Sequence, residues 1–210
     1  MTAIASIMIR PRATMRRILD AGRDRMVIPL VLLATLSAIL GDLDRSSLDA
    51  MRKLPVNFGL LAVGICVGVS AFFLLLFYVF TWIAYGMGRL LEGTATPREV
   101  RSAMAWGLAP IIWSILYRLP AVIIWPGTME SRLRLHDSAQ LSINPNLMGM
   151  GCIGSVIFAA LELTMLIWYC VVASNTLGEA NRFSAARGFG ALVLTGISPA
   201  IILIAAVLAS

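Results

Sequence analysis

Two charged residues stand inside long apolar runs, where a charge is most costly and where its chemistry would matter most. Arg118 interrupts the stretch Ser102–Met129, and Glu162 interrupts the stretch Ser138–Gly178. A charge at the bilayer centre costs about 2.5–3.5 kcal/mol even on the mildest scales, so each residue is a candidate functional site. A rise of about 1.5 Å per helical residue places the two Cα atoms ~10 Å apart in depth. Because a long Arg side chain nearly bridges that gap, we predict an Arg118–Glu162 intramembrane charge pair, formed directly or through water or Tyr117.

Glu162 has a second interpretation, in which it relays protons or binds a cation inside a small transporter or channel. Intramembrane acids on ion pathways usually act with further polar groups. No second acid accompanies Glu162 within its apolar run. The sequence therefore favours structural pairing with Arg118 and keeps transport as the alternative.

The remaining reactive side chains form no pattern that is typical of an enzyme. His136 is the only histidine, and the serines lack a nearby general base. No carboxylate pair or phosphate-binding loop is present. The three cysteines, Cys66, Cys152 and Cys170, are scattered among apolar neighbours without a C-x-x-C, which favours packing over metal binding or disulfide formation. We expect no catalytic residue, no metal and no cofactor.

The composition requires lipid as the surrounding solvent. The chain is 59% apolar and 13% charged over 210 residues, with a mean hydropathy of +0.87. Soluble domains are only about 45–50% apolar. The apolar runs are continuous rather than alternating with period two, and a helix needs about 20 residues to cross the membrane, which favours helices over a barrel. We predict an all-α polytopic bundle with five transmembrane helices, at Met26–Gly41, Leu54–Gly88, Ser102–Met129, Ser138–Gly178 and Gly188–Ser210.

Basic residues set the predicted orientation, because Lys and Arg are retained on the cytoplasmic side. One set of segments carries eleven arginines: Arg10, Arg12, Arg16, Arg17, Arg23, Arg25, Arg89, Arg98, Arg101, Arg182 and Arg187. The other set carries five basic residues: Arg45, Arg52, Lys53, Arg132 and Arg134. The N-terminus is therefore predicted to be cytoplasmic and the C-terminus to lie outside. The net charge of +6 reflects mostly this asymmetry, so we expect no nucleic-acid partner.

Residues 1–25 form a separate basic segment ahead of the transmembrane domain at 26–210. Apolar residues in this segment recur at helical spacing, with arginines on the other faces. This predicts an amphipathic helix on the cytoplasmic leaflet, whose Arg12, Arg16, Arg17 and Arg23 face anionic lipid head groups at about 1 kcal/mol each. The alternative is that the arginines only fix the topology.

The second predicted span contains a G-x-x-x-G at Gly64 and Gly68. Small residues at this spacing let a neighbouring helix backbone approach closely. We interpret the pair as a helix-packing site.

A capping box opens the third span. Thr96 is the predicted cap, Pro97 the first helical residue and Glu99 the residue three after the cap. Pro110 follows within the apolar stretch, where its missing N–H removes one helical hydrogen bond and predicts a kink.

The same layout recurs later in the chain, where Ser184 is a plausible cap and Pro199 follows fifteen residues on. Thr96 precedes Pro110 by fourteen residues. The second and third spans and the fourth and fifth spans are therefore interpreted as a degenerate parallel repeat.

The stretch "GRLLEGTATPREVRSAMAWGLAPIIWSIL" resembles the central motif of the bacterial branch of the Yip (Ypt-interacting protein) family. The N-terminal "IRPRATMRRIL" is similar to the opening segment of that family. The positions that match the motif, or cap its helix, are Arg89, Gly93, Thr96, Pro97, Arg98, Glu99, Arg101 and Pro110. The resemblance implies an integral, non-enzymatic membrane protein with five spans. Eukaryotic relatives bind small GTPases in membrane trafficking, but this chain has only about 25 residues before its first span rather than a long cytosolic domain.

These observations define the expected function. We expect a multi-pass protein of the bacterial inner membrane that contacts other integral membrane proteins, associates with itself, or organises the bilayer. The alternatives are a small transporter or channel that uses Glu162, and an accessory subunit of a larger membrane complex.

Overall fold

The structure is a computed structural model that describes residues 3–22, 24–42, 58–124 and 145–209. All regular structure in these ranges is helical, which agrees with the predicted all-α fold. The helices are α1 (Ala3–Ile9), α2 (Pro11–Asp20), the 3-10 turn η1 (Asp24–Met26), α3 (Val27–Asp42), α5 (Phe58–Leu90), α6 (Pro97–Gly107), α7 (Ala109–Trp113), α8 (Ile115–Ile124), α11 (Pro145–Ala180) and α12 (Ala185–Ala209).

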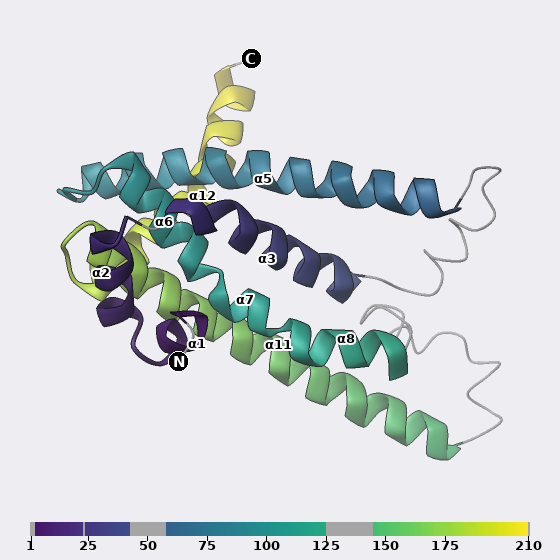
Figure 1. Cartoon of the computed structure of the whole chain (residues 1–210). Coiled ribbons are helices and arrows are strands. Elements are labelled where there is room, and N and C mark those ends of the chain that lie inside the picture. Colours follow the sequence, from purple (N-terminus) through teal and green to yellow (C-terminus); the bar gives the residue numbers. More distant parts are fainter. Residues whose placement is uncertain (1–2, 23, 43–57, 125–144, 210) are drawn as a thin grey trace.

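Two long helices set the length of the molecule (Figure 1). α5 and α11 run along opposite sides of this view, and α3 lies between them and contacts α5, α7 and α8. The end of α5, the start of α6, the end of α11 and the start of α12 gather at one end of the bundle, where α1 and α2 also pack. We call this the α2 end.

Length and apolarity identify two candidate membrane spans in the described residues. They are Gly59–Leu90 within α5 and Val156–Ala180 within α11, and Val27–Gly41 in α3 is a shorter apolar helix. The third and fifth predicted spans are not single straight helices.

The third predicted span is a broken helix. α6 ends at Gly107, Leu108 joins it to α7, and Ser114 joins α7 to α8. Pro110 lies in the first turn of α7, and because it has no N–H it leaves a carbonyl of the preceding turn without its usual partner. The predicted kink near Pro110 is thus a full interruption between two helices.

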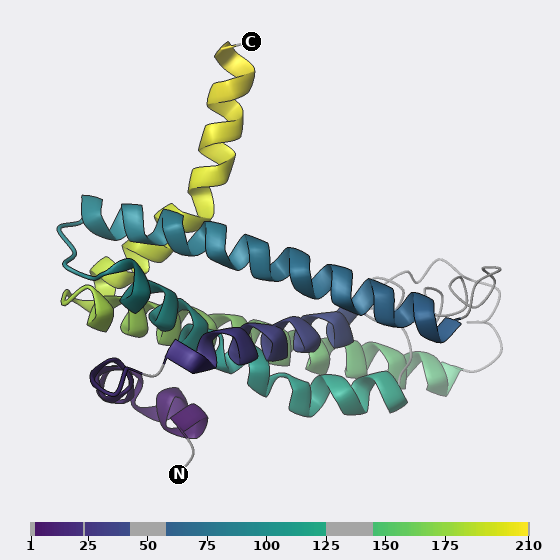
Figure 2. The ribbon, with the colours of Figure 1, turned by 45° about the horizontal axis from the view of Figure 1, so that its top comes forward.

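α12 is 25 residues long and contains Pro199 within the helix. Its first part packs against α11 and α5. Its C-terminal part leaves the bundle and points away from α5 (Figure 2).

The buried core lies toward the α2 end and joins α1 and α2 to the helix ends gathered there. It includes Met15 of α2, Val100 and Trp106 of α6, and Leu177 of α11, none more than 3% exposed. Large apolar side chains along α5 and α11 are instead exposed, among them Leu75 at 63% and Leu166 at 58%. A surface of this kind is suited to lipid and not to water.

The two glycines of the G-x-x-x-G lie on this open surface. A Cβ placed on Gly64 or Gly68 would meet no heavy atom within 4 Å. Among the described residues, no helix makes the close approach that was predicted there.

Candidate functional site

Arg118 and Glu162 contact each other directly between α8 and α11. Arg118 Nε donates to Glu162 Oε1 at 2.8 Å, and Arg118 Nη2 donates to Oε2 at 2.6 Å. This two-pronged geometry is the strongest form of a charge-assisted hydrogen bond. The side chains are 15% and 29% exposed. The contact is direct and needs no bridge by Tyr117, whose ring packs edge-on against Phe158 at 5.7 Å between centroids.

The ion pair continues onto α3. Arg118 Nη1 donates to the backbone carbonyl of Ser37 at 2.8 Å, and the hydroxyls of Ser37 and Ser114 lie 2.8 Å apart. A Cβ on Gly41 would lie 3.1 Å from the Arg118 guanidinium carbon. Ser37 and Gly41 thus form a small, polar face of α3 that receives the guanidinium. We call Ser37, Ser114, Arg118 and Glu162 the polar cluster.

The polar cluster holds three helices together and has little capacity for chemistry. Each oxygen of Glu162 already accepts from Arg118. The two-pronged contact and the further hydrogen bond to Ser37 offset part of the cost of placing these charges among apolar helices. The sequence predicted the pair but not Ser37, Gly41 or Ser114. The only signal for Ser37 and Gly41 is the four-residue spacing of these small residues on α3.

The predicted capping box is present at the start of α6. Thr96 Oγ1 accepts from the Glu99 backbone N–H at 3.3 Å, and Glu99 Oε2 accepts from the Thr96 backbone N–H at 2.6 Å. Pro97 occupies the first turn. Because both ends of the box are satisfied, the loop enters α6 in one conformation.

The loop before α6 is fastened to the loop between α11 and α12. The backbone N–H of Thr94 donates to the carbonyl of Asn181 at 3.4 Å. Asn181 is only 3% exposed. A Cβ on Gly88 would lie 2.8 Å from Asn181 Oδ1, and one on Gly93 would lie 2.7 Å from the Gly88 carbonyl oxygen and closer still to Asn181. Only glycine leaves room for the asparagine at these two positions.

The two loops end their preceding helices in the same way. The Gly93 N–H donates to the Gly88 carbonyl at 2.8 Å, and the Phe183 N–H donates to the Gly178 carbonyl at 2.9 Å. Such a six-to-one bond is the mark of a Schellman helix end. The residue before each donor has a positive φ, 65° at Glu92 and 59° at Arg182. These equivalent helix ends agree with the repeat inferred from sequence.

Ser184 caps α12, as its position in the sequence predicted. Its Oγ accepts from the Arg187 backbone N–H at 3.4 Å. Arg187 also lies 4.0 Å from Glu92, across the two loops. We call residues 89–98 and 182–187 the paired loops.

The matched family positions divide between anchors and exposed side chains. Gly93 and Pro110 are buried, whereas Arg89, Pro97 and Arg98 are exposed. Leu90 is 75% exposed beside them. Arg101 is half-buried, with its guanidinium over the Tyr78 ring at 5.7 Å from the centroid. The motif thus builds a fixed loop and presents charged and apolar side chains from it.

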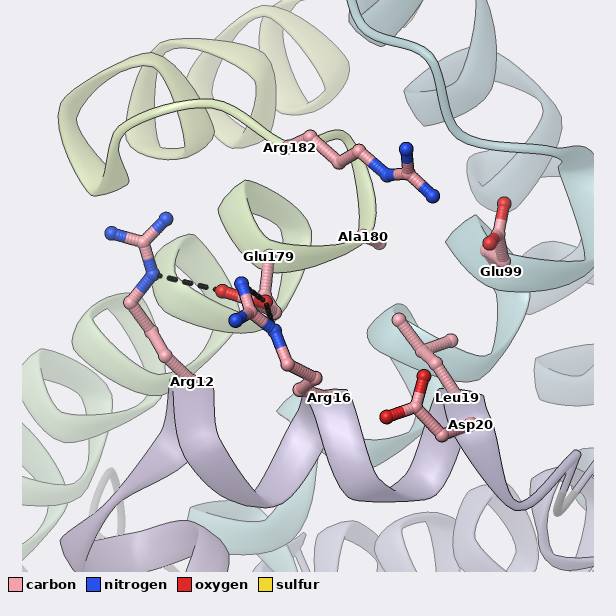
Figure 3. Close-up of a pocket in the computed structure, with 8 residues that line it drawn as sticks. All are labelled: Arg12, Arg16, Leu19, Asp20, Glu99, Glu179, Ala180 and Arg182. Carbon is pink, nitrogen blue, oxygen red and sulfur yellow. Dashed lines mark hydrogen bonds and ion pairs between the residues drawn. The ribbon is translucent and has the colours of Figure 1, made fainter.

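The basic N-terminal segment packs on α11 through an acid that sequence reasoning did not single out. Arg12 Nε lies 3.3 Å from Glu179 Oε2, and Arg16 approaches Oε1 to 2.6 Å (Figure 3). Arg12 also donates to the Phe183 carbonyl at 2.7 Å. These two arginines therefore serve a protein contact. Arg17 is exposed, and Arg23 lies outside the described residues.

A pocket of about 420 Å³ lies beside this contact, between α2, α6 and the end of α11. Its charged side chains balance, with three arginines and three acids (Figure 3). They are Arg12, Arg16, Arg182, Asp20, Glu99 and Glu179. The side chains of Arg12 and Arg16 turn toward Glu179, not toward a free ligand position. The described residues include no group of three or more His, Cys, Asp or Glu arranged to hold a metal.

The Yip1 domain family model matches residues 5–209 of the chain. No curated protein matches the chain, and no solved structure does.

Proposed function

The chain belongs to the Yip family, since the Yip1 domain match covers nearly all of it, and from this premise we propose a non-enzymatic integral membrane protein that works through contacts with other membrane proteins. Its family and its apolar helices mark it as membrane-associated. The proposed topology has five spans in a bacterial inner membrane. The N-terminus and the paired loops are in the cytoplasm, and the C-terminus lies outside.

The paired loops carry this proposal. They are held by two Schellman helix ends, two caps and the buried Asn181, yet the side chains of Leu90, Glu92 and Arg98 face outward. Ordering a surface loop costs conformational entropy. A loop that is already ordered in the free protein does not incur this cost when a partner binds, which favours binding. Leu90, exposed between charged neighbours, has the character of a contact residue.

The polar cluster supports a structural protein over a transporter. An acid that carries protons or cations must exchange its partners, whereas both oxygens of Glu162 are taken by Arg118. None of the residues of the cluster belongs to the paired loops that we propose as the working surface. It supplies rigidity to the helices that hold those loops.

Site-specific photo-crosslinking in cells tests the proposal. A photoreactive amino acid at Leu90 is expected to give a discrete protein adduct, whether with another membrane protein or with a second copy of this chain. The same amino acid at Leu75, on the same helix and 63% exposed among apolar neighbours, is the control and is expected to react with lipid alone. If Leu90 gives no protein adduct and the gently solubilised protein is always alone, the contact function is excluded.

A further inference from the structure

An apolar cavity of about 570 Å³ lies among α3, α5, α6, α11 and α12, separate from the polar cluster and from the paired loops. Its volume falls within the range of about 300–1,000 Å³ that is usual for small-molecule pockets. Both candidate membrane spans contribute walls, Phe73 and Phe77 from one and Tyr169 from the other. The cavity therefore lies at the depth of the spans.

Both threonine hydroxyls in its walls are already satisfied. Thr35 Oγ1 donates to the Val31 carbonyl at 2.9 Å, and Thr195 Oγ1 donates to the Ala191 carbonyl at 2.7 Å. Because these hydroxyls bond within their own helices, they offer no donor to a guest in the cavity. A polar solute or an ion would lose most of its hydration in these largely apolar walls, whereas a hydrocarbon would gain dispersion contacts with them.

A cation on α6 lies within one helical turn of the residues that line this cavity. Arg101 is one turn before the lining residue Met104 on α6, and the lining residue Leu108 is one further turn on. The guanidinium of Arg101 rests over the ring of Tyr78, which follows the lining residue Phe77. Among the described residues, no carboxylate pairs with Arg101. One charge is thus left available at the end of the cavity that faces the α2 end.

We propose that this cavity binds one anionic phospholipid, with an acyl chain between α3, α5 and α12 and the phosphate on Arg101. An apolar cavity open to a bilayer is filled by hydrocarbon and not by water. A guanidinium matches the geometry of a phosphate and forms charge-assisted hydrogen bonds with it. The lipid fills the space between α5 and the other helices, and its binding does not depend on the protein contacts proposed above.

Two glycines of α12 provide a matched test of the acyl-chain position. Gly196 lines the cavity and Gly190 does not, and a Cβ on either would meet no heavy atom within 4 Å. The change Gly196→Leu therefore places a side chain in the cavity without a backbone clash, and Gly190→Leu adds the same side chain elsewhere on α12. Ala38→Leu fills the cavity from the opposite wall on α3 and guards against an effect particular to α12.

Two arginines provide a matched test of the phosphate position. Arg89 lies over the Tyr85 ring at 5.6 Å, much as Arg101 lies over Tyr78 at 5.7 Å. Arg89 is not next to the cavity lining. Arg101→Gln is expected to remove the preference for an anionic lipid, and Arg89→Gln is expected to leave it unchanged.

The measurement is native mass spectrometry of the full-length, delipidated protein titrated with phosphatidylglycerol. Phosphatidylcholine with the same chains, a free fatty acid and inorganic phosphate are the comparison probes. The wild type is expected to bind one phosphatidylglycerol at least tenfold more tightly than any comparison probe. Gly196→Leu and Ala38→Leu are expected to weaken it at least tenfold, while Gly190→Leu does not. Arg101→Gln is expected to bring phosphatidylglycerol down to the level of phosphatidylcholine.

Three results would overturn the proposal. Unchanged binding in a Gly196→Leu protein that melts like Gly190→Leu would remove the cavity from the site. Equal binding of the two phospholipids by the wild type would remove the role of Arg101. Binding of the free fatty acid as tightly as phosphatidylglycerol would show that the ligand is a fatty acid and not a phospholipid. Loss of Leu90 crosslinks alone leaves these measurements unaffected, so the two proposals fail separately.

Discussion

At the scale of single residues, the polar cluster shows how a charge is accommodated among apolar helices. Arg118 uses its Nε and both terminal nitrogens, two toward Glu162 and one toward the Ser37 carbonyl. A lysine has one ammonium and lacks the planar fork that reaches three acceptors at once. The residue that makes space for this fork is Gly41, since any side chain there would meet the guanidinium.

Neutralising one member of the pair is expected to destabilise the protein. Glu162→Gln leaves Arg118 with a weaker acceptor in a partly buried position, and the cost of such a loss is about 1–3 kcal/mol. The thermal midpoint in detergent should fall accordingly. Arg118→Met should lower it by a similar amount, because the carboxylate is then left unpaired.

Removing both charges is the control for this prediction. The double change Arg118→Met with Glu162→Met leaves no uncompensated charge, and replacing a buried pair by apolar residues is often neutral. We expect the double variant to melt above either single variant, which is non-additive behaviour. Unchanged melting in both single variants would show that the pair does not hold the helices together.

Gly93 gives a second residue-scale prediction. Gly93→Ala places a methyl group within 2.7 Å of the Gly88 carbonyl oxygen and against Asn181, so one of the paired loops must shift. We expect a lower thermal midpoint and weaker crosslinking from Leu90. Gly86→Ala, two residues before Gly88 on α5, is the control, because its new Cβ meets nothing within 4 Å and alanine favours the helix by up to about 1 kcal/mol. Equal stability of the two variants would contradict the tight packing at Asn181.

At the scale of elements, α2 is held by charge and by apolar contact together. Its Met15 and Ile18 side chains are buried in the core, and its Arg12 and Arg16 side chains form ion pairs with Glu179 of α11. The arginine side chains are 44% and 72% exposed, so solvent screens both ion pairs. Exposed pairs of this kind contribute about 0.2–1 kcal/mol each.

Glu179→Gln is therefore expected to loosen α2 without unfolding the bundle. Limited trypsin cleavage after Arg16 and Arg17 should become about two- to tenfold faster, following the loss of roughly 1 kcal/mol of local stability. Glu92→Gln is the control, because the Glu92 side chain is 88% exposed and its ion pair with Arg187 is long, at 4.0 Å. Identical cleavage rates for the two variants would mean that Glu179 does not anchor α2.

Several elements follow from local sequence rules. The capping box at Thr96 and Glu99 and the break near Pro110 depend on neighbouring residues alone, so they were predictable. The contact of Arg118 with Glu162 followed from the cost of isolated charges in lipid. The match to the Yip1 domain confirms the family that the motif indicated.

Other features depend on contacts between distant segments and were not predictable from local patterns. Glu179 lies 163 residues from Arg16, and nothing near Arg16 in the sequence names its partner. Asn181 packs against Gly88 and Gly93 of another hairpin, and the Ser37 hydroxyl contacts the hydroxyl of Ser114 at the junction of α7 and α8. The glycine pair at Gly64 and Gly68 followed a valid rule for helix packing, but the described helices of this chain do not use it.

At the scale of the whole molecule, rigid and open regions lie in different places. Burial and the contacts between loops concentrate near the α2 end, where the paired loops, α2 and the core meet. Along α5 the candidate span is essentially unburied, and the C-terminal part of α12 stands clear of the bundle. The molecule therefore joins a well-packed platform to helices whose outer surfaces require lipid or another protein.

The proposed topology makes a prediction for the whole molecule that labelling in intact cells checks. In a chain with Cys66, Cys152 and Cys170 changed to alanine, a new cysteine at Thr94 should react with a membrane-impermeant maleimide only after the cells are opened. Thr94 is suitable because it is exposed and joins the other loop through its backbone, not its side chain.

A cysteine at Ser131, in the segment predicted to lie outside, should react in intact cells at the same reagent concentration. The asymmetry of basic residues favours this result, because eleven arginines are placed inside and five basic residues outside. Labelling of Thr94→Cys in intact cells would reverse the orientation and place the paired loops outside, where cytoplasmic partners do not reach them. If both cysteines are instead protected until the cells are opened, both positions are cytoplasmic and the number of spans between them is even. This result is expected if the broken helix from α6 to α8 returns to the side from which it came.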